Sequence, residues 1–191
     1  MQISIRKLTP ELAQDYVRFF DETPHDQNVP EHKCYCVCWI SANSDHFDCS
    51  TVDKRRIAAV KLINEGYLKG YLAYAGDRVV GWCNANTKSE CTNCVSWRYF
   101  LKEVPLDCTH SKSVFCFVIA PEMQRKGIAT KLLEYVIADA KADGYTHVEA
   151  YPNKHFTSIA ADFMGPAVMY SKLGFIQSSE TTEKLIMRKT L

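Results

Sequence analysis

Six residues, Gln124–Ala129 (QRKGIA), combine the residue types that a phosphate-binding turn needs. The glycine within them lets a ligand approach the backbone closely, and Arg125 and Lys126 place two positive charges beside it. The first turn of a helix adds unpaired N–H groups and the positive end of the helix dipole. The sequence therefore predicts that a diphosphate binds where this helix begins. The alternative is an ordinary strand-to-helix turn with an incidental glycine.

The elements predicted on either side would hold this turn in place. The uninterrupted apolar run Val114–Ile119 before it is typical of a central strand. After it, the pattern predicts a helix over Gln124–Asp143, which Gly144 ends. The apolar face of this helix is formed by Ile128, Leu132, Leu133, Val136, Ile137 and Ala140. Other patterns predict strands over residues 3–6, 67–75, 78–86, 146–151, 175–177 and 184–188, and helices over 9–23, 53–65, 97–102 and 166–173.

The composition indicates a folded chain. Of its 191 residues 47% are hydrophobic, the net charge is +1 and the pI is near 7.5, which predicts one domain over residues 1–191 with a sizeable core. No long basic block is present, which argues against nucleic acid as a partner. The N-terminal MQISIRKLTPEL lacks the apolar core of a signal peptide, and no run approaches the ~18 apolar residues that span a bilayer. We therefore expect a soluble, cytoplasmic protein with no membrane partner.

Two sequence blocks, in this order, resemble the GNAT superfamily of acetyl-CoA-dependent N-acetyltransferases. Gln124, Gly127 and Ala129 occupy the positions of that family's [RQ]-x-x-G-x-[GA] signature. The block Tyr170–Phe175 (YSKLGF) matches its second signature, Tyr-x-Lys-x-Gly-Phe. The resemblance is strong over residues 113–188 and weaker over the rest. Both blocks together are more specific than either block alone.

The resemblance implies an α/β fold: a mixed, mostly antiparallel twisted sheet of six or seven strands, flanked by helices and splayed between the fourth and fifth strands. Residues 1–112 would form the acceptor-side half with a long loop, and residues 113–191 the half that binds the coenzyme. Acetyl-CoA is the implied co-substrate, and no metal is expected. Its pantetheine arm would pair with the strand edge at Phe117, Val118 and Ile119. Its diphosphate would bind Gln124, Arg125, Lys126, Gly127, Ile128, Ala129 and Thr130.

The resemblance also implies direct transfer of the acetyl group to an amine. Tyr170 matches the tyrosine that gives a proton to the departing thiolate, the alternative being a tyrosine that only packs. The family often has an asparagine seven residues earlier, where this chain has Phe163. Asn153 is the nearest asparagine, so either it takes over that coenzyme contact or the contact is absent.

The group that accepts the amine proton is not fixed by the sequence. The family's frequent carboxylate on the fourth strand is missing, because VFCFVI contains none. We name Glu149, on the next strand, as the candidate base. A chain of water molecules is one alternative, and the others are Glu103, Asp107, His110 and His147.

The cysteines are numerous but poorly spaced for a metal. Nine cysteines without a secretion signal indicate reduced thiols. Cys91–Cys94 is a single C-x-x-C pair, and zinc needs four ligands, so no metal site is predicted. The segment Cys34–Trp39 (CYCVCW), with Phe47 beyond it, is aromatic. Tyr35, Trp39 and Phe47 either form the wall of a substrate pocket or anchor a long loop to the core.

The sequence thus predicts an acetyl-CoA-dependent N-acetyltransferase whose acceptor is a primary amine of a small molecule. A protein or peptide acceptor is one alternative, and a non-catalytic module that senses acyl-CoA is another. The acceptor itself is not identified, and a homodimer is left open.

Overall fold

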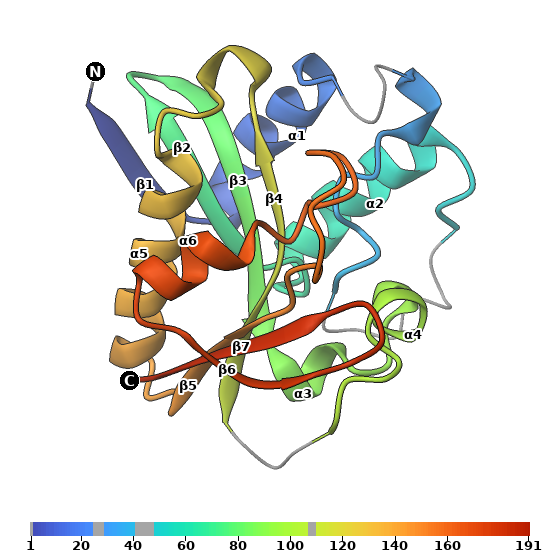
Figure 1. Ribbon diagram of the computed structural model, residues 1–191. Coiled ribbons are helices and arrows are strands. Elements are labelled where there is room, and N and C mark those ends of the chain that lie inside the picture. Colours follow the sequence, from blue (N-terminus) through green and yellow to red (C-terminus); the bar gives the residue numbers. More distant parts are fainter. Residues whose placement is uncertain (1, 25–28, 41–47, 107–109) are drawn as a thin grey trace.

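A seven-stranded sheet runs through the molecule in the order β1-β2-β3-β4-β5-β7-β6 (Figure 1). The computed structural model describes residues 2–24, 29–40, 48–106 and 110–191. The strands are β1 (Ile3–Lys7), β2 (Gly70–Ala75), β3 (Arg78–Thr87), β4 (Ser111–Ile119), β5 (His147–Ala150), β6 (Ile176–Glu180) and β7 (Leu185–Thr190). β4 and β5 are parallel, and the other neighbouring pairs are antiparallel. The predicted mixed, mostly antiparallel sheet is confirmed.

Helices cover both faces of this sheet: α1 (Ala13–Glu22), α2 (Val52–Asn64), α3 (Lys88–Cys91), α4 (Val95–Phe100), α5 (Ile128–Ala142) and α6 (Ala167–Lys172). Gly81 and Trp82 are consecutive on β3, so they face opposite sides of the sheet. A Cβ added to Gly81 would lie 3.1 Å from Ile128 of α5. The Trp82 ring meets the ring of Tyr16, on α1, at a centroid distance of 4.8 Å. α5 and α6 therefore cover one face, and α1 and α2 the other (Figure 1).

The helix α5 begins at Ile128, later than the predicted start at Gln124. Arg125 and Gly127 take the left-handed conformation, which a right-handed helix cannot contain. A 3₁₀ turn, Pro121–Met123, precedes them. The predicted apolar face is buried at Ile128, Leu132, Leu133, Val136 and Ala140, and partly buried at Ile137. The interruption places a bent turn, rather than a helical one, in front of α5.

The predicted splay between the fourth and fifth strands is present. β5 pairs with β4 only over Ser111–Val114, whereas β4 continues to Ile119. Beyond Ala150 the chain leaves β4, and Asn153 forms an isolated bridge with Lys184, next to β7. The second half of β4 consequently has one edge that no strand covers.

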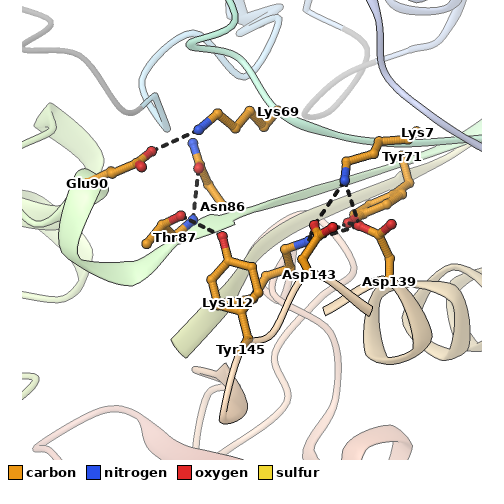
Figure 2. A network of polar contacts seen from close by, with 10 residues as sticks. All are labelled: Lys7, Lys69, Tyr71, Asn86, Thr87, Glu90, Lys112, Asp139, Asp143 and Tyr145. Atoms are coloured by element: carbon orange, nitrogen blue, oxygen red, sulfur yellow. Dashed lines mark hydrogen bonds and ion pairs between the residues drawn. The ribbon is translucent and has the colours of Figure 1, made fainter. Parts of the chain in front are cut away.

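The C-terminal end of α5 is fixed by ion pairs and hydrogen bonds (Figure 2). Lys112 of β4 is buried, and its ammonium lies 2.9 Å from the carboxylate of Asp139 and 3.2 Å from that of Asp143. Lys7 of β1 pairs with the same two carboxylates at 3.0 Å. Burial would raise the pKa of the Asp139 carboxyl, but hydrogen bonds from Tyr71, Lys112 and Lys7 outweigh it and lower that pKa to about 2. The two lysines and the two aspartates of this cluster therefore neutralise one another.

In the described part of the chain, no helix has both the length and the apolar character needed to span a membrane.

Candidate active site

The turn that leads into α5 leaves a row of backbone N–H groups without partners. Arg125 and Gly127 have φ angles of +61° and +78°. Within the described part of the chain, the N–H groups of residues 125–130 have no acceptor, and the next one, of Lys131, donates to the Gly127 carbonyl at 3.0 Å. No atom lies within 4 Å of the position that a Cβ would take on Gly127. The turn is therefore open to a ligand with several acceptor oxygens.

Positive charge surrounds these donors. Arg125 and Lys126 are both exposed. Glu122, the nearest carboxylate in sequence, is paired with Arg78 at 2.6 Å. The dipole of a 15-residue helix, Ile128–Ala142, adds to this potential at its first turn. An anion that carries more than one phosphate matches this arrangement.

Next to the turn is the uncovered edge of β4. N–H groups alternate in direction along a strand, so those of Phe117 and Ile119 point to this edge, whereas that of Val118 points to β3. The Gln124 side chain donates to the Ile119 carbonyl at 3.3 Å and so ties the turn to the end of β4. The N–H of Phe117 donates to the carbonyl of Phe163 at 2.7 Å. Of the three edge residues predicted, Val118 thus directs its N–H away from the opening.

Residues 153–166, here called the strap, connect β5 to α6 and reach the uncovered edge. The carboxylate of Asp162 organises the strap from within. It accepts the N–H groups of Thr157 and Ser158 at 2.8 and 3.2 Å, and the side-chain amide of Asn153 at 2.9 Å. The strap is therefore a folded segment whose one backbone bond to β4 is the one that Phe163 makes.

Tyr170 lies beneath the strap. Its hydroxyl donates to the Met164 carbonyl at 2.5 Å, and its side chain is fully buried. Burial raises the pKa of Tyr170 well above its ordinary value. A Cβ added to Gly165 would lie 2.8 Å from Met169 and 3.4 Å from the Phe117 ring, so the strap packs closely on β4. Tyr170, predicted to protonate the leaving thiolate, and the N–H of Phe117, predicted to pair with the pantetheine arm, are covered by adjacent carbonyls of the strap.

Asn153, expected near the coenzyme, is engaged inside the strap. Its amide nitrogen donates to Asp162 and, at 3.2 Å, to the Ala161 carbonyl. Its amide oxygen accepts a hydrogen bond from the ammonium of Lys184. With both ends bound, the side chain stabilises the strap instead of presenting a free polar group.

Glu149, named as the candidate base, is fully buried and completely paired. One carboxylate oxygen lies 2.8 Å from the ammonium of Lys88 and accepts the Tyr151 hydroxyl at 2.8 Å. The other lies 2.5 Å from the guanidinium of Arg188. Tyr151 also bonds the hydroxyl of Ser113 at 2.7 Å. Both oxygens are thus occupied and no face of the carboxylate is open to an amine, so the geometry does not support Glu149 as the base.

The alternative bases are not brought to the uncovered edge either. Glu103 accepts the N–H of Thr182 at 2.9 Å. His110 and His147 lie where the parallel strands β4 and β5 begin, which is the end opposite the splay. Asp107 lies outside the described residues. No described carboxylate or imidazole among these candidates lies beside Tyr170.

The aromatic segment near the N-terminus anchors a loop to the core. Tyr35 and Trp39 are buried. The Trp39 ring stacks on Phe115 at a centroid distance of 4.7 Å and on Phe100 at 6.1 Å. Phe47 lies outside the described residues. Of the two readings of this segment, the geometry favours the anchor for Tyr35 and Trp39.

The thiols do not gather into a metal centre in the described ranges, where no group of three or more potential ligands was found. Cys36, Cys91 and Cys94 are buried, as is common for reduced cysteines in a core.

Sequence reasoning missed the strap contacts and Lys184. The acceptors that cover Phe117 and Tyr170 are backbone carbonyls of Phe163 and Met164, and a carbonyl carries no residue-type signal. The long stretch between Asn153 and Tyr170 is the sequence feature that could have drawn attention to them.

Comparison with known proteins identifies the family. The model of the acetyltransferase (GNAT) family matches residues 11–163. The chain belongs to the acetyltransferase (GNAT) family. No curated protein matches it in sequence.

Solved structures share the GNAT fold at low sequence identity. PaiA N-acetyltransferase from Thermoplasma acidophilum, solved with coenzyme A, is 14% identical, with a TM-score of 0.54 and 100% of both chains covered. Ribosomal-protein-S5-alanine acetyltransferase from Vibrio fischeri is 14% identical, with a TM-score of 0.57 over 100% of this chain and 93% of that one. YncA from Salmonella typhimurium, solved with its cofactor acetyl-CoA, is 15% identical, with a TM-score of 0.51 over 99% of this chain and 94% of that one.

The residues of this GNAT chain fit one end of acetyl-CoA directly. The free N–H groups of residues 125–130 and the two cations beside them suit the diphosphate. At the thioester end, the donors of Phe117 and Tyr170 are held by the strap carbonyls. The predicted coenzyme, acetyl-CoA, thus agrees with the family.

Proposed function

We propose that this protein transfers an acetyl group from acetyl-CoA to a primary amine of a small molecule. The observation that carries the proposal is the row of unpaired N–H groups at residues 125–130, which adjoins the uncovered edge of β4. The diphosphate of the coenzyme is bound by this row, and its pantetheine arm follows the edge toward Tyr170. Family membership supports the reaction type, and the geometry supports the position.

The chemistry requires two donors that this chain can supply. Once Phe163 withdraws, the Phe117 N–H donates to the thioester carbonyl oxygen and stabilises the negative charge that develops there. Tyr170, released from Met164, gives its proton to the departing sulfur. The amine nitrogen forms the new bond to the acetyl carbon, the carbon–sulfur bond breaks, and the proton of the amine passes to solvent.

A small-molecule acceptor is favoured by the size of the space near the strap. A hollow of about 400 Å³ lies between α4 and the β6–β7 turn, which is within the range of small-ligand pockets. Two solved neighbours, by contrast, are named for ribosomal-protein alanine acceptors. A peptide terminus is therefore the second acceptor to test.

A non-catalytic acyl-CoA sensor is the alternative that the closed strap favours, because both proposed donors are covered in this structure. Two measurements separate it from an enzyme. Calorimetry with CoA reports binding, and thiol release from acetyl-CoA with a panel of amines reports turnover. An enzyme binds CoA and releases thiol in an amine-dependent manner, whereas a sensor binds CoA without amine-dependent release.

Replacement of Tyr170 tests its part in the reaction. In the Tyr170→Phe variant we expect kcat to fall about 100-fold, because the leaving sulfur loses its proton donor, while the Kd for CoA stays within about twofold. Tyr135→Phe, on the exposed side of α5, is the matched control and should match the wild type. An unchanged kcat in Tyr170→Phe would remove this tyrosine from the mechanism.

A further inference from the structure

The hollow between α4 and the β6–β7 turn has one apolar wall and one polar wall. Its lining includes Tyr99, Phe100 and Leu101 from the first element, and Thr181, Thr182 and Lys184 from the second. Tyr99 and Phe100 are 76% and 39% exposed, and together they give this wall an apolar surface. The volume, about 400 Å³, is enough for a molecule of roughly amino-acid size.

Phe100, which lines the hollow, links it to the proposed reaction centre. The ring of Phe100 packs edge-to-face on the ring of Phe163, with centroids 5.2 Å apart. The carbonyl of the same Phe163 accepts the Phe117 N–H at 2.7 Å. The rings of Phe100 and Phe163 thus lie between the hollow and the strand edge, and a shift of Phe163 that uncovers Phe117 would bring the two spaces closer together.

Lys184, which lines the hollow, is a buried cation that is 5% exposed. In the part of the chain that the structure describes, no carboxylate lies within 4.0 Å of its ammonium. Its one hydrogen-bond acceptor is the amide oxygen of Asn153, and its ammonium lies 5.9 Å from the ring centre of Phe163. Burial lowers the pKa of Lys184, although Glu183 and Asp162 act in the opposite direction.

A buried ammonium is costly unless an anion pairs with it. An amide oxygen satisfies one of the three donors of Lys184 and none of its charge. The carboxylate of a ligand in the hollow would supply what is missing. The Lys184 ammonium lies 5.9 Å from the Phe163 ring centre, and the Phe163 carbonyl accepts the Phe117 N–H, so a ligand that reaches both places carries its carboxylate close to its reacting amine.

We propose that the acceptor is an α-amino acid with an apolar or aromatic side chain, and that this hollow binds it. The inference rests on the proposed function and specifies its substrate. The carboxylate pairs with Lys184, the side chain lies along Tyr99 and Phe100, and the neighbouring amine faces the thioester carbon. The reaction forms the amide nitrogen–carbon bond, breaks the carbon–sulfur bond, and leaves an N-acetyl amino acid, the thiol of CoA and one proton to solvent.

Matched pairs of amines with and without the carboxylate test this assignment. Phenylalanine is compared with phenethylamine, and leucine with 3-methylbutylamine, as acceptors in acetyl-CoA-dependent thiol release. The wild type should prefer each amino acid by at least 10-fold in kcat/KM. In Lys184→Met this advantage should fall by about 10- to 100-fold, since a hydrogen bond between charged groups is lost, while the two plain amines change by less than about threefold.

Two further variants make the result specific to the buried charge. Lys184→Arg keeps a cation and should retain the preference for the amino acid. Lys141→Met removes an exposed lysine of α5 that does not line the hollow and should have no effect. Thermal unfolding of each variant shows whether it is folded, and the preference of the wild type decides the question even if Lys184→Met does not fold.

The possible failures are distinguishable. A wild type that binds CoA but prefers the plain amines, or that acetylates none of the four, overturns the acceptor assignment and leaves the coenzyme site standing. Equal losses on both members of a pair in Lys184→Met also overturn it. If CoA does not bind at all, the proposed function falls and this inference falls with it.

Discussion

The two ends of α5 have a similar backbone conformation, but they differ in whether their N–H groups have hydrogen-bond acceptors. Gly127 before the helix and Gly144 after it both have a left-handed φ, +78° and +79°, and neither has an atom within 4 Å of an added Cβ. After the helix, the N–H groups of Gly144 and Tyr145 donate to carbonyls of the last turn. Before it, no acceptor in the described ranges meets the N–H groups of residues 125–130.

The charges differ in the same way. At the C-terminal end, Lys7 and Lys112 pair with Asp139 and Asp143 (Figure 2). At the N-terminal end, two exposed cations adjoin the free donors, and the nearby carboxylate is paired elsewhere. A left-handed glycine is thus no sign of a site by itself. A binding site is indicated instead by N–H donors and positive charges that find no partner among the described residues.

The largest effect should come from an aspartate placed at each glycine. Aspartate tolerates the left-handed conformation, and at a helix start its carboxylate accepts the free N–H groups. Gly127→Asp should therefore fold and lose at least 100-fold in CoA affinity, about 2.7 kcal/mol, by calorimetry. Gly144→Asp should bind CoA within about twofold of the wild type.

A neutral variant separates the two causes of that loss. Gly127→Asn also caps the helix but brings no charge, so its affinity should lie between those of the wild type and Gly127→Asp. Similar losses in Gly127→Asp and Gly144→Asp would show that α5 stability, and not the donor row, controls binding.

The second largest effect concerns the C-terminal end of α5, where the charges are paired. Lys112→Met should lower the free energy of unfolding by about 2 kcal/mol, because two carboxylates lose their buried partner, while CoA affinity is unchanged. Lys7→Met, at a half-exposed lysine, should cost less than about 1 kcal/mol. Urea unfolding measures both. A Lys112→Met protein that is as stable as the wild type would mean that the network is not structural.

The same network predicts a pH dependence at its carboxylate. The pKa of Asp139 is lowered to about 2 in the folded protein, so its contribution is present above the unfolded value, near 3.8, and is lost as pH falls from about 4 to 2. We expect about 1–2 kcal/mol of stability to disappear over this window. Asp139→Asn should flatten the curve there, and an equally steep curve in that variant would assign the acid sensitivity to other groups.

The smallest effect on CoA binding or stability should come from a single exposed cation at the N-terminal end of α5. Lys126→Met removes one exposed cation, which should weaken CoA binding by about three- to tenfold in low salt and less in high salt. Its unfolding should match that of the wild type, which is the reverse of Lys112→Met. Weaker binding that is insensitive to salt would contradict an electrostatic role.

The sequence was most informative where a feature is local. The apolar face of α5, the glycine before it and the uninterrupted strand Val114–Ile119 follow from short-range patterns, and their positions were predicted correctly. The start of α5 was misplaced because two left-handed residues interrupt a pattern that polarity alone extends to Gln124. Propensity and apolar periodicity do not report a positive φ at Arg125.

The active site was less predictable because it depends on contacts across the chain. Glu149 was a plausible base until Lys88 and Arg188, each far away in sequence, were seen to hold it. The strap is held against β4 and Tyr170 by the backbone carbonyls of Phe163 and Met164. Every residue has such a carbonyl, so the sequence does not indicate which ones form these bonds. The residue type suggests which side chains could take part in a site. Their hydrogen-bond partners and their burial can be known only from the three-dimensional structure.

A crystal structure of the protein with acetyl-CoA tests the account most directly. We expect the diphosphate oxygens within hydrogen-bond distance of N–H groups of residues 125–130, and the Phe163 carbonyl displaced from the Phe117 N–H. A diphosphate bound elsewhere would contradict the central claim. So would a thioester next to Tyr170 with the bond between Phe163 and Phe117 intact.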